Sequence, residues 1–232
     1  MSFRHFGRGV GGSIRDVVEL RGEPTLGLRE RKKRRTRATL IDAAVGLCER
    51  QGFDGTTVDQ IAAIAEVSPR TFSRYFATKD AIALALIDEV LENAASELAR
   101  QPLNLNHMEA LRRSYVAMVR NTQLESTGAL SAERLLQILR IVMSSAALRQ
   151  AVVEYRASAV DIVLAQRMNT TVEDRRIKLL AAVWGALLMT AMRELTTAAS
   201  DATRIGVDDV VAAFENTYAD FAGEIAGLGQ PV

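Results

Sequence analysis

Four hydrogen-bond donors in one short segment suit binding to phosphates and to the edges of nucleic-acid bases. They follow Pro69 at almost consecutive positions: Arg70, Thr71, Ser73 and Arg74. Arginine pairs with phosphate or with the edge of guanine, and the hydroxyls of Ser and Thr bond to either. The pattern predicts contacts with a nucleic acid, with a plain helical hairpin whose polar face is only solvated as the alternative.

Two predicted helices joined by a tight turn position these donors. Thr57, with Gln60 three residues later, has the sequence signature of a capping box. Ser68 is a good N-cap for the second helix. Phe72 and Phe76 are four residues apart, so both anchor one side of that helix while the donors face the other. An anchored helix with outward donors is typical of the recognition helix of a helix-turn-helix motif.

A dense basic run precedes these helices. Residues 29–37 hold seven Lys or Arg residues and one acidic residue, Glu30. Such a run repels itself unless an anion is near, and nucleic acid is the usual anion. A solvated face is the alternative. We expect phosphate contacts here, above all from Arg34, Arg35 and Arg37.

The distribution of charge supports the same reading. The whole chain has a formal net charge of only +1. Residues 1–80, however, carry 15 Lys or Arg against 10 Asp or Glu, whereas residues 81–232 carry 14 against 18. A basic first part and an acidic remainder favour a polyanion-binding module followed by a part with another function.

The segment from Ala38 to Ile87 resembles the TetR-type bacterial transcriptional regulators. The resemblance rests on Ala43-Ala44, Gly52-Phe53, Thr56-Thr57-Val58, Ile61-Ala62, Val67-Ser68, Thr71-Phe72, Tyr75-Phe76, Lys79 and Asp80. Two features depart from the family pattern. Glu66 stands in the turn where the family usually has Gly, and Ser73 and Arg74 stand where it usually has aromatic residues.

The donors and the resemblance together predict a homodimer that binds a palindromic operator in double-stranded DNA. Arg70, Thr71, Ser73 and Arg74 would touch bases or adjacent phosphates. Thr57, Ser68, Tyr75 and Lys79 would hold the DNA backbone with the basic run, Lys79 from a helix N-terminus that favours phosphate. The regulator would be a ligand-released repressor. A DNA-binding activator, or an architectural protein without an effector, is the first alternative.

The composition predicts an all-helical chain in three parts. We expect a disordered tail over 1–27, or a basic arm using Arg4, Arg8 or Arg15, a helix-turn-helix domain over 28–80 and a ligand-binding and dimerisation domain over 81–232. The helices are expected over 28–51, 58–65, 70–76, 79–100, 107–123, 131–143, 146–168, 172–199 and 207–225. The helix over 79–100 would link the two halves.

The most apolar stretch of the chain runs from Leu179 to Met192, with Trp184 in its middle. Its 14 residues are fewer than the roughly 20 that span a bilayer, so we expect no membrane segment. An apolar helix in a soluble protein is buried on most sides. This helix and the last one are therefore predicted to pair with their copies in a second subunit, as the TetR resemblance also implies.

The second half is also predicted to hold a small-molecule effector. Large apolar or amphipathic residues expected to face inward are the candidates for its lining: Tyr115, Met118, Leu139, Met143, Tyr155, Trp184 and Leu188. Ordinary core packing is the alternative for each of them. The segment from Ala38 to Ala81 is similar to the mycofactocin-associated regulators of the family, and that resemblance would imply a long-chain acyl-CoA effector.

The residue types argue against catalysis. We expect no cofactor, because the chain has no glycine-rich phosphate loop and no nucleophile motif. Its two histidines have no metal-ligand partners at suitable spacing, so no metal site is expected. An enzyme built on scattered carboxylates, Glu154, Asp161 and Glu194, is a further alternative, although each is expected to pair with an Arg at the surface.

The cysteine content and the N-terminal residues favour a location in the cytoplasm. The chain has a single cysteine, Cys48, which is expected to be buried, and no signal peptide is expected.

Overall fold

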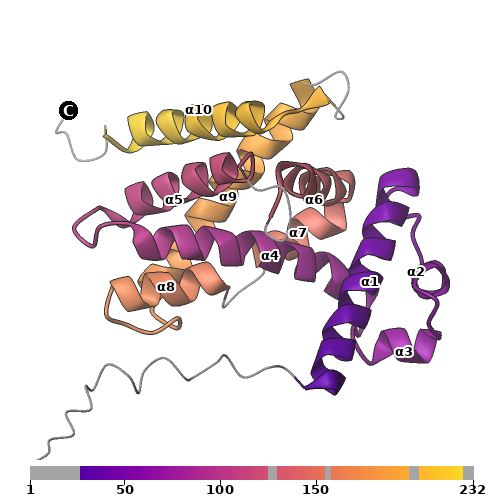
Figure 1. The fold of residues 1–232 in the computed structure, drawn as a ribbon. Coiled ribbons are helices and arrows are strands. Elements are labelled where there is room, and N and C mark those ends of the chain that lie inside the picture. Colours follow the sequence, from indigo (N-terminus) through magenta and orange to yellow (C-terminus); the bar gives the residue numbers. More distant parts are fainter. Residues whose placement is uncertain (1–26, 125–129, 155–157, 199–203, 227–232) are drawn as a thin grey trace, which may run out of the picture. The chain divides into compact units, whose positions relative to one another are not determined.

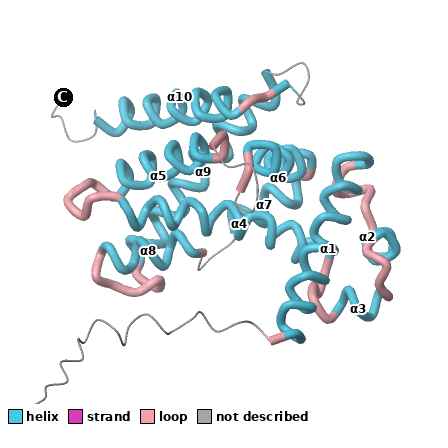
Figure 2. The backbone as a smooth tube through the Cα atoms, in the orientation of Figure 1, coloured by secondary structure: helices cyan, strands magenta, loops and turns pink. Residues whose placement is uncertain are grey.

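The computed structural model describes residues 27–124, 130–154, 158–198 and 204–226. Within these ranges the chain is all-helical, as predicted, and has no β-strand (Figures 1 and 2). Its helices are α1 (Leu28–Gln51), α2 (Val58–Ile64), α3 (Pro69–Ser73), α4 (Lys79–Arg100), α5 (His107–Asn121), α6 (Ala132–Ser144), α7 (Ala146–Glu154), α8 (Ala159–Arg167), α9 (Arg175–Ala198) and α10 (Val207–Ala226).

The chain divides into two compact units, residues 1–38 and residues 39–232. The described part of the first unit is the basic beginning of α1. The Gly27 carbonyl accepts the N–H groups of Glu30 and Arg31 at 2.9 and 3.0 Å, which starts the helix. One turn on, Arg34 lies 3.9 Å from Glu30. The predicted tail lies outside the described residues except for Gly27.

The second unit begins with a small core around the rest of α1. Leu40, Ile61 and Phe72, from α1, α2 and α3, are each at most 1% exposed. Phe53, which follows α1, belongs to the same core and is 3% exposed. Gly52 ends α1 with a φ of +74°, a conformation that glycine adopts without steric cost. Burial raises the pKa of the Cys48 thiol, so this cysteine is a small core residue as expected.

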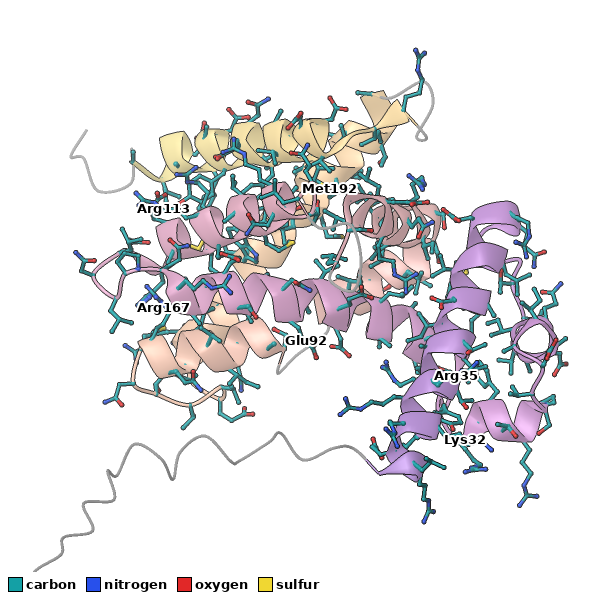
Figure 3. The ribbon with its side chains drawn as sticks, viewed as in Figure 1. Lys32, Arg35, Glu92, Arg113, Arg167 and Met192 are labelled. Atoms are coloured by element: carbon teal, nitrogen blue, oxygen red, sulfur yellow. The ribbon has the colours of Figure 1, made fainter. Side chains whose placement is uncertain are left out.

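Helix α4 is the common packing partner of the later helices. Its N-cap is Thr78, whose side chain accepts the N–H of Ala81 at 3.2 Å. It then packs against α5, α6, α7 and α8. At its far end Arg167 of α8 donates hydrogen bonds to the carbonyls of Gln101 and Pro102 at 2.7 and 2.8 Å (Figure 3). These bonds satisfy carbonyls that the end of a helix leaves open.

The structure corrects one helix of the sequence analysis. A single helix was expected over 146–168, but α7 ends at Glu154 and α8 begins at Ala159. Ser158 is extended and caps α8, because its side chain accepts the N–H of Asp161 while the Asp161 carboxylate accepts the N–H of Ser158 at 2.9 Å. Ser and Asp three residues apart are the sequence signature of this cap, so the break had a readable signal.

Aromatic rings join α5, α9 and α10. The ring centroids of Tyr115 and Phe214 lie 4.6 Å apart, and those of Trp184 and Phe214 lie 5.1 Å apart. Distances of this size are typical of favourable tilted and edge-on aromatic pairs. Arg112 of α5 adds a bidentate bond to Glu215 of α10 at 2.6 and 2.8 Å. α10 is therefore held to the bundle by both apolar and ionic contacts.

Helix α9 is less buried than expected. Its buried residues are Ile177, Trp184, Leu187, Ala191 and Met192. Leu179 is 63% exposed, so the expectation of burial on most sides is wrong for the single chain. The whole helix has 24 residues and is long enough and apolar enough to cross a membrane. The expectation of no membrane segment had counted only the 14 residues from Leu179 to Met192. One such helix is weak evidence for a span, because long core or interface helices have the same composition.

Candidate DNA-binding surface and effector cavity

The helix-turn-helix begins with the two predicted caps. The Thr57 side chain accepts the N–H of Gln60 at 3.3 Å, and the Gln60 side chain accepts the N–H of Thr57 at 3.0 Å. This reciprocal pair is the predicted capping box. Ser68 caps α3 through a bond of 3.1 Å from the N–H of Thr71. The hydroxyls of Thr57 and Ser68 are therefore already used as caps, and both residues remain exposed.

Two phenylalanines fix the orientation of α3. Phe72 and Phe76 are 1% and 4% exposed, and their ring centroids lie 6.0 Å apart. Because they hold one side of the helix in the core, Arg70 and Arg74 lie four residues apart on the opposite side, and both are exposed. Two outward guanidiniums on a short anchored helix form a surface that can bind phosphate or guanine.

The other donor residues of this segment are either hydrogen-bonded within the protein or half-buried. Ser73 is exposed, but its hydroxyl donates to the Pro69 carbonyl at 3.1 Å. Thr71 and Tyr75 are half-buried. The helix was predicted to continue to Phe76, but α3 ends at Ser73. The next residues continue in tight turns, in which the N–H of Tyr75 reaches the carbonyl of Phe72 at 2.8 Å.

Glu66 makes the turn of the motif in an unusual conformation. Its φ is +53°, in the left-handed region that residues other than glycine rarely adopt. The N–H of the next residue, Val67, bonds to the Ala62 carbonyl at 2.9 Å and closes the turn. The turn therefore accepts a side chain, as the sequence required, at a conformational cost that glycine would not have.

Lys79 is engaged inside the protein. Its ammonium donates to the carbonyl of Phe53 at 2.7 Å and lies 4.3 Å from the centroid of the Phe53 ring. These contacts tie the start of α4 to the turn that follows α1. The predicted contact between Lys79 and DNA stays a prediction, and it would use a donor that these contacts leave available.

The basic run of the first unit is exposed. Arg34, Arg35 and Arg37 all lie at the surface of α1, as do the other cations of residues 29–37. Figure 3 labels Lys32 and Arg35, whose side chains extend outward from the helix. Exposed cations along one helix supply the sequence-independent attraction for a phosphate backbone.

Two apolar cavities lie among the helices of the second half. One, of about 90 Å³, lies between α4, α5, α8 and α9. The other, of about 120 Å³, lies between α4, α5, α6, α9 and α10. They share the lining residues Ile87, Leu91, Val152, Leu188 and Met189. The two cavities therefore adjoin along these residues and together form the apolar site considered below, whose apolar lining is typical of small-molecule sites.

Four of the seven predicted effector residues line this site. Trp184 lines the first cavity, Tyr115 and Leu139 line the second, and Leu188 lines both. Burial raises the pKa of Tyr115 above its ordinary value, so its hydroxyl is neutral in the cell. The site is thus lined by apolar and neutral aromatic groups over most of its surface.

The remaining three predicted effector residues lie elsewhere. Met118 lines a separate, more polar cavity of about 410 Å³ between α4 and α5. Met143 packs against the core without lining either apolar cavity. Tyr155 lies outside the described residues. Helical spacing alone does not say which of several inward residues borders a gap, so these three could not be separated from the other four.

Polar contacts connect α1 to α6 and to the start of α7. Arg134 of α6 lies 3.7 Å from Asp42 of α1 and 3.5 Å from Glu89 of α4. Arg140 of α6 lies 3.1 Å from Glu49 of α1. These pairs were not predicted from the sequence, because residues so far apart along the chain give no local signal.

A hydrogen bond completes this connection. The hydroxyl of Ser145, between α6 and α7, donates to the carboxylate of Asp54 at 2.9 Å. Asp54 follows α1, and Leu139 of α6 lines the second apolar cavity. The same helix therefore borders the cavity and contacts the helix-turn-helix.

The geometry defines a class of protein: a helix-turn-helix motif followed by a helical second half that holds apolar cavities. Residues 40–86 match the model of the family described as "Bacterial regulatory proteins, tetR family". The match is confined to the helix-turn-helix segment, and it agrees with the resemblance to the TetR-type regulators seen in the sequence.

Known proteins similar to the chain are transcriptional regulators. The HTH-type transcriptional regulator TcmR of Streptomyces glaucescens is 44% identical over 108 residues, which cover 45% of this chain and 48% of that protein. The HTH-type transcriptional repressor NicS of Pseudomonas putida is 27% identical over 93 residues, covering 40% and 44%. The chain thus spans about half the length or less of these curated relatives. None of these relatives is named as an enzyme.

Solved structures resemble the chain over more of its length but at lower identity. Thermus thermophilus FadR, a TetR family transcriptional repressor in complex with lauroyl-CoA, is 19% identical, with a TM-score of 0.49. The comparison covers 84% of this chain and 97% of that one. A likeness of this size carries no conclusion about the ligand of this chain.

Proposed function

We propose that the chain is a homodimeric, sequence-specific transcriptional repressor that a small hydrophobic molecule releases from its operator. One observation carries the DNA-binding part: α3 and the turn after it are anchored by the buried Phe72 and Phe76, and this segment presents Arg70 and Arg74 to solvent. A twofold dimer would place two such helices in successive major grooves, about 34 Å apart. Such a regulator acts on the chromosome, so we place it in the bacterial cytoplasm.

Two kinds of DNA contact follow from this arrangement. Arg70 and Arg74, with Thr71 and Ser73, would reach bases or adjacent phosphates. The DNA backbone would be held by phosphate contacts from a second group: Thr57, Ser68, Tyr75, Lys79, Arg34, Arg35 and Arg37. The first group would carry sequence preference and the second would carry most of the salt dependence.

The exposed face of α9 supports the dimer. Leu179, Ala182 and Ala186 are exposed at spacings of three and four residues, so they form one apolar stripe. On α10 the exposed Ala212 and Ala219 lie on one face in the same way. Small residues let two helices approach closely, and a self-complementary pair of faces is the arrangement of a twofold interface.

A charge within this stripe tests the dimer. Ala186→Glu should shift the protein from dimer to monomer in light scattering after gel filtration, because the new carboxylate would be buried without a partner. Glu133→Ala, at an exposed site on α6, is the control, and it should leave the mass unchanged. A dimer that tolerates Ala186→Glu would contradict this interface.

The apolar site supports the effector part of the proposal. A tightly packed second half would favour a DNA-binding protein without an effector, and the two adjoining cavities argue for an effector instead. An enzyme would need clustered ionisable groups, and among the described residues no group of three or more His, Cys, Asp or Glu could hold a metal. A long-chain acyl-CoA remains the effector that the family resemblance suggests.

Helices α4 and α6 would transmit the effector signal. Both line the apolar site, and both are tied to the helix-turn-helix, α4 through Lys79 and α6 through Arg134 and Arg140. An effector that prefers one position of these helices would shift the separation of the two recognition helices in the dimer. Equal separations in the free and effector-bound dimers would contradict this coupling.

Selection from random duplex DNA at two salt concentrations tests the proposed function. Recovery of one palindromic site with a steep salt dependence is the expected result. Arg70→Ala and Arg74→Ala should then each cost about 1–3 kcal/mol at the selected site and relax its sequence preference. Salt-dependent binding without any preferred sequence would contradict the proposal.

A further inference from the structure

A buried carboxylate lies at one end of the apolar site. Asp161 of α8 is 7% exposed and lines the cavity of about 90 Å³ together with Trp184 and Leu164. The sequence analysis expected Asp161 at the surface beside an Arg, and that expectation is wrong. Of the other two carboxylates considered, Glu194 is exposed and the side chain of Glu154 lies outside the described part.

The partners of this carboxylate are neutral. One oxygen, Oδ2, accepts the N–H of Ser158 at 2.9 Å and is 3.0 Å from the Ser158 hydroxyl. Within the described ranges no Lys or Arg forms an ion pair with Asp161. A buried charge is costly unless it is paired and hydrogen-bonded. The α8 dipole offsets part of this cost, because Asp161 lies in the first turn of α8.

Capping alone does not explain the position of Asp161. Asp209 caps α10 in the same way, with its Oδ2 accepting the N–H of Gly206 three residues earlier at 2.8 Å. Asp209 is exposed, where its charge is solvated. Asp161 instead makes its cap at the wall of an apolar cavity. The cavity wall therefore contains a carboxylate whose hydrogen-bond partner among the described residues, Ser158, is neutral.

The rest of the wall sets the shape of that ligand. Trp184, in the same cavity, offers an aromatic face or edge near a bound cation. Aliphatic residues then continue the wall toward Tyr115 in the second cavity, through the shared Leu91 and Leu188. A ligand that fits has a positively charged head and a narrow hydrophobic body.

We propose that the apolar site binds a hydrophobic organic cation, with its ammonium-type head at Asp161 and Ser158 and its apolar body along the shared wall. This inference rests on the proposed effector site and names the class of its ligand. It disfavours an acyl-CoA at this end of the site, because the anionic phosphates of coenzyme A would meet the Asp161 carboxylate.

A series of ligands that differ only in the head group tests the inference on the full chain. Octylammonium, octan-1-ol and octanoate are titrated against the fluorescence of Trp184, which is the sole tryptophan of the chain and lines the cavity. We expect octylammonium to bind at least about tenfold more tightly than octan-1-ol, as close charge pairs do at desolvated sites, and octanoate to bind most weakly.

Two matched variants test whether the Asp161 carboxylate causes the preference for octylammonium. Asp161→Asn keeps the size and a capping oxygen, and it should remove most of the preference for octylammonium while leaving octan-1-ol within about twofold of its wild-type affinity. Asp209→Asn removes an equivalent capping charge far along the chain and should change neither affinity. If Asp161→Asn fails to fold, the affinities of the wild-type protein for the three ligands still test whether the site prefers a cationic head group.

Several results would overturn the inference. They are equal affinity for the three head groups, tighter binding of octanoate, no binding of any of them, or an unchanged preference in a folded Asp161→Asn. The proposed function is tested separately by operator binding. An operator complex that an acyl-CoA releases while octylammonium does not would reject the cation and keep the repressor. Failure to select any operator would reject the repressor.

Discussion

The ammonium of Lys79 donates a hydrogen bond of 2.7 Å to the carbonyl of Phe53 and lies 4.3 Å from the centroid of the Phe53 ring. Phe53 follows α1, and Lys79 begins α4. A single side chain therefore fastens the start of the long helix to the core of the helix-turn-helix.

Replacing Lys79 by Met separates its structural role from its predicted role in DNA binding. Lys79→Met should lower the free energy of unfolding by about 1–2 kcal/mol, because a charged hydrogen bond and a cation–π contact are lost. If Lys79 also contacts phosphate, the slope of log affinity against log salt should fall by about 0.9. Lys178→Met, an exposed change on α9, is the control. A stable Lys79→Met with an unchanged slope would contradict both roles.

The turn at Glu66 should become more stable with glycine. Glu66 has a φ of +53°, and left-handed backbone costs an L-residue roughly 1–2 kcal/mol. Glu66→Gly should therefore raise the free energy of unfolding by about 1 kcal/mol, measured in urea. Gly52→Ala is the opposite control, because Gly52 has a φ of +74° and alanine should lower stability there. A loss of stability in Glu66→Gly would show that its side chain makes a favourable contact.

The contacts of Arg134 should matter more for signalling than for folding. Arg134→Met removes the ion pairs with Asp42 and Glu89, which are partly exposed and are worth no more than about 1 kcal/mol in stability. The ratio of operator affinities without and with a saturating effector should fall several-fold, since this ratio measures the coupling. Arg113→Met, on a pair confined to α5, is the control. An unchanged ratio would place the coupling in α4 alone.

Glu109 gives the bundle a stabilising contribution that depends on pH. Its hydrogen bond with Arg112 lowers the pKa of Glu109 from 4.5 to about 2. A carboxyl group with a lowered folded-state pKa stabilises fully above its unfolded pKa and loses this effect as the pH falls through the folded value. Glu109→Gln should therefore be less stable than the wild type at pH 7, and the difference should shrink between about pH 4.5 and pH 2. Glu224→Gln, at an exposed site on α10, should show a much smaller change.

Local signals predicted where the two helices of the helix-turn-helix begin, although α3 ends before the predicted Phe76. Thr57 and Ser68 each cap the helix that the sequence assigned to them. These features depend on neighbours within four residues, so they are visible in the chain itself. The DNA contacts stay predictions, because exposure of Arg70 and Arg74 does not by itself identify what they touch.

The second half was predicted less well because its features depend on distant residues. Arg134 meets Asp42 across more than ninety positions, and no local pattern announces such a pair. Trp184 and Met143 have similar apolar surroundings in the sequence, but only Trp184 borders the cavity, since cavities arise where packing is incomplete. The cap at Ser158 was the exception, a local signal that would have revealed the break between α7 and α8 but not the burial of Asp161.

The bonds from Arg167 to the carbonyls of Gln101 and Pro102 hold the C-terminal end of α4 in place. A rotation of α4 about this end would therefore move its other end, at Lys79, the most. The helix has 22 residues, and its length is therefore about 33 Å at 1.5 Å per residue. A rotation of about 5° about the held end would carry the Lys79 end through roughly 3 Å. A small adjustment beside the cavity would thus be magnified before it reaches the surface that carries Arg70 and Arg74.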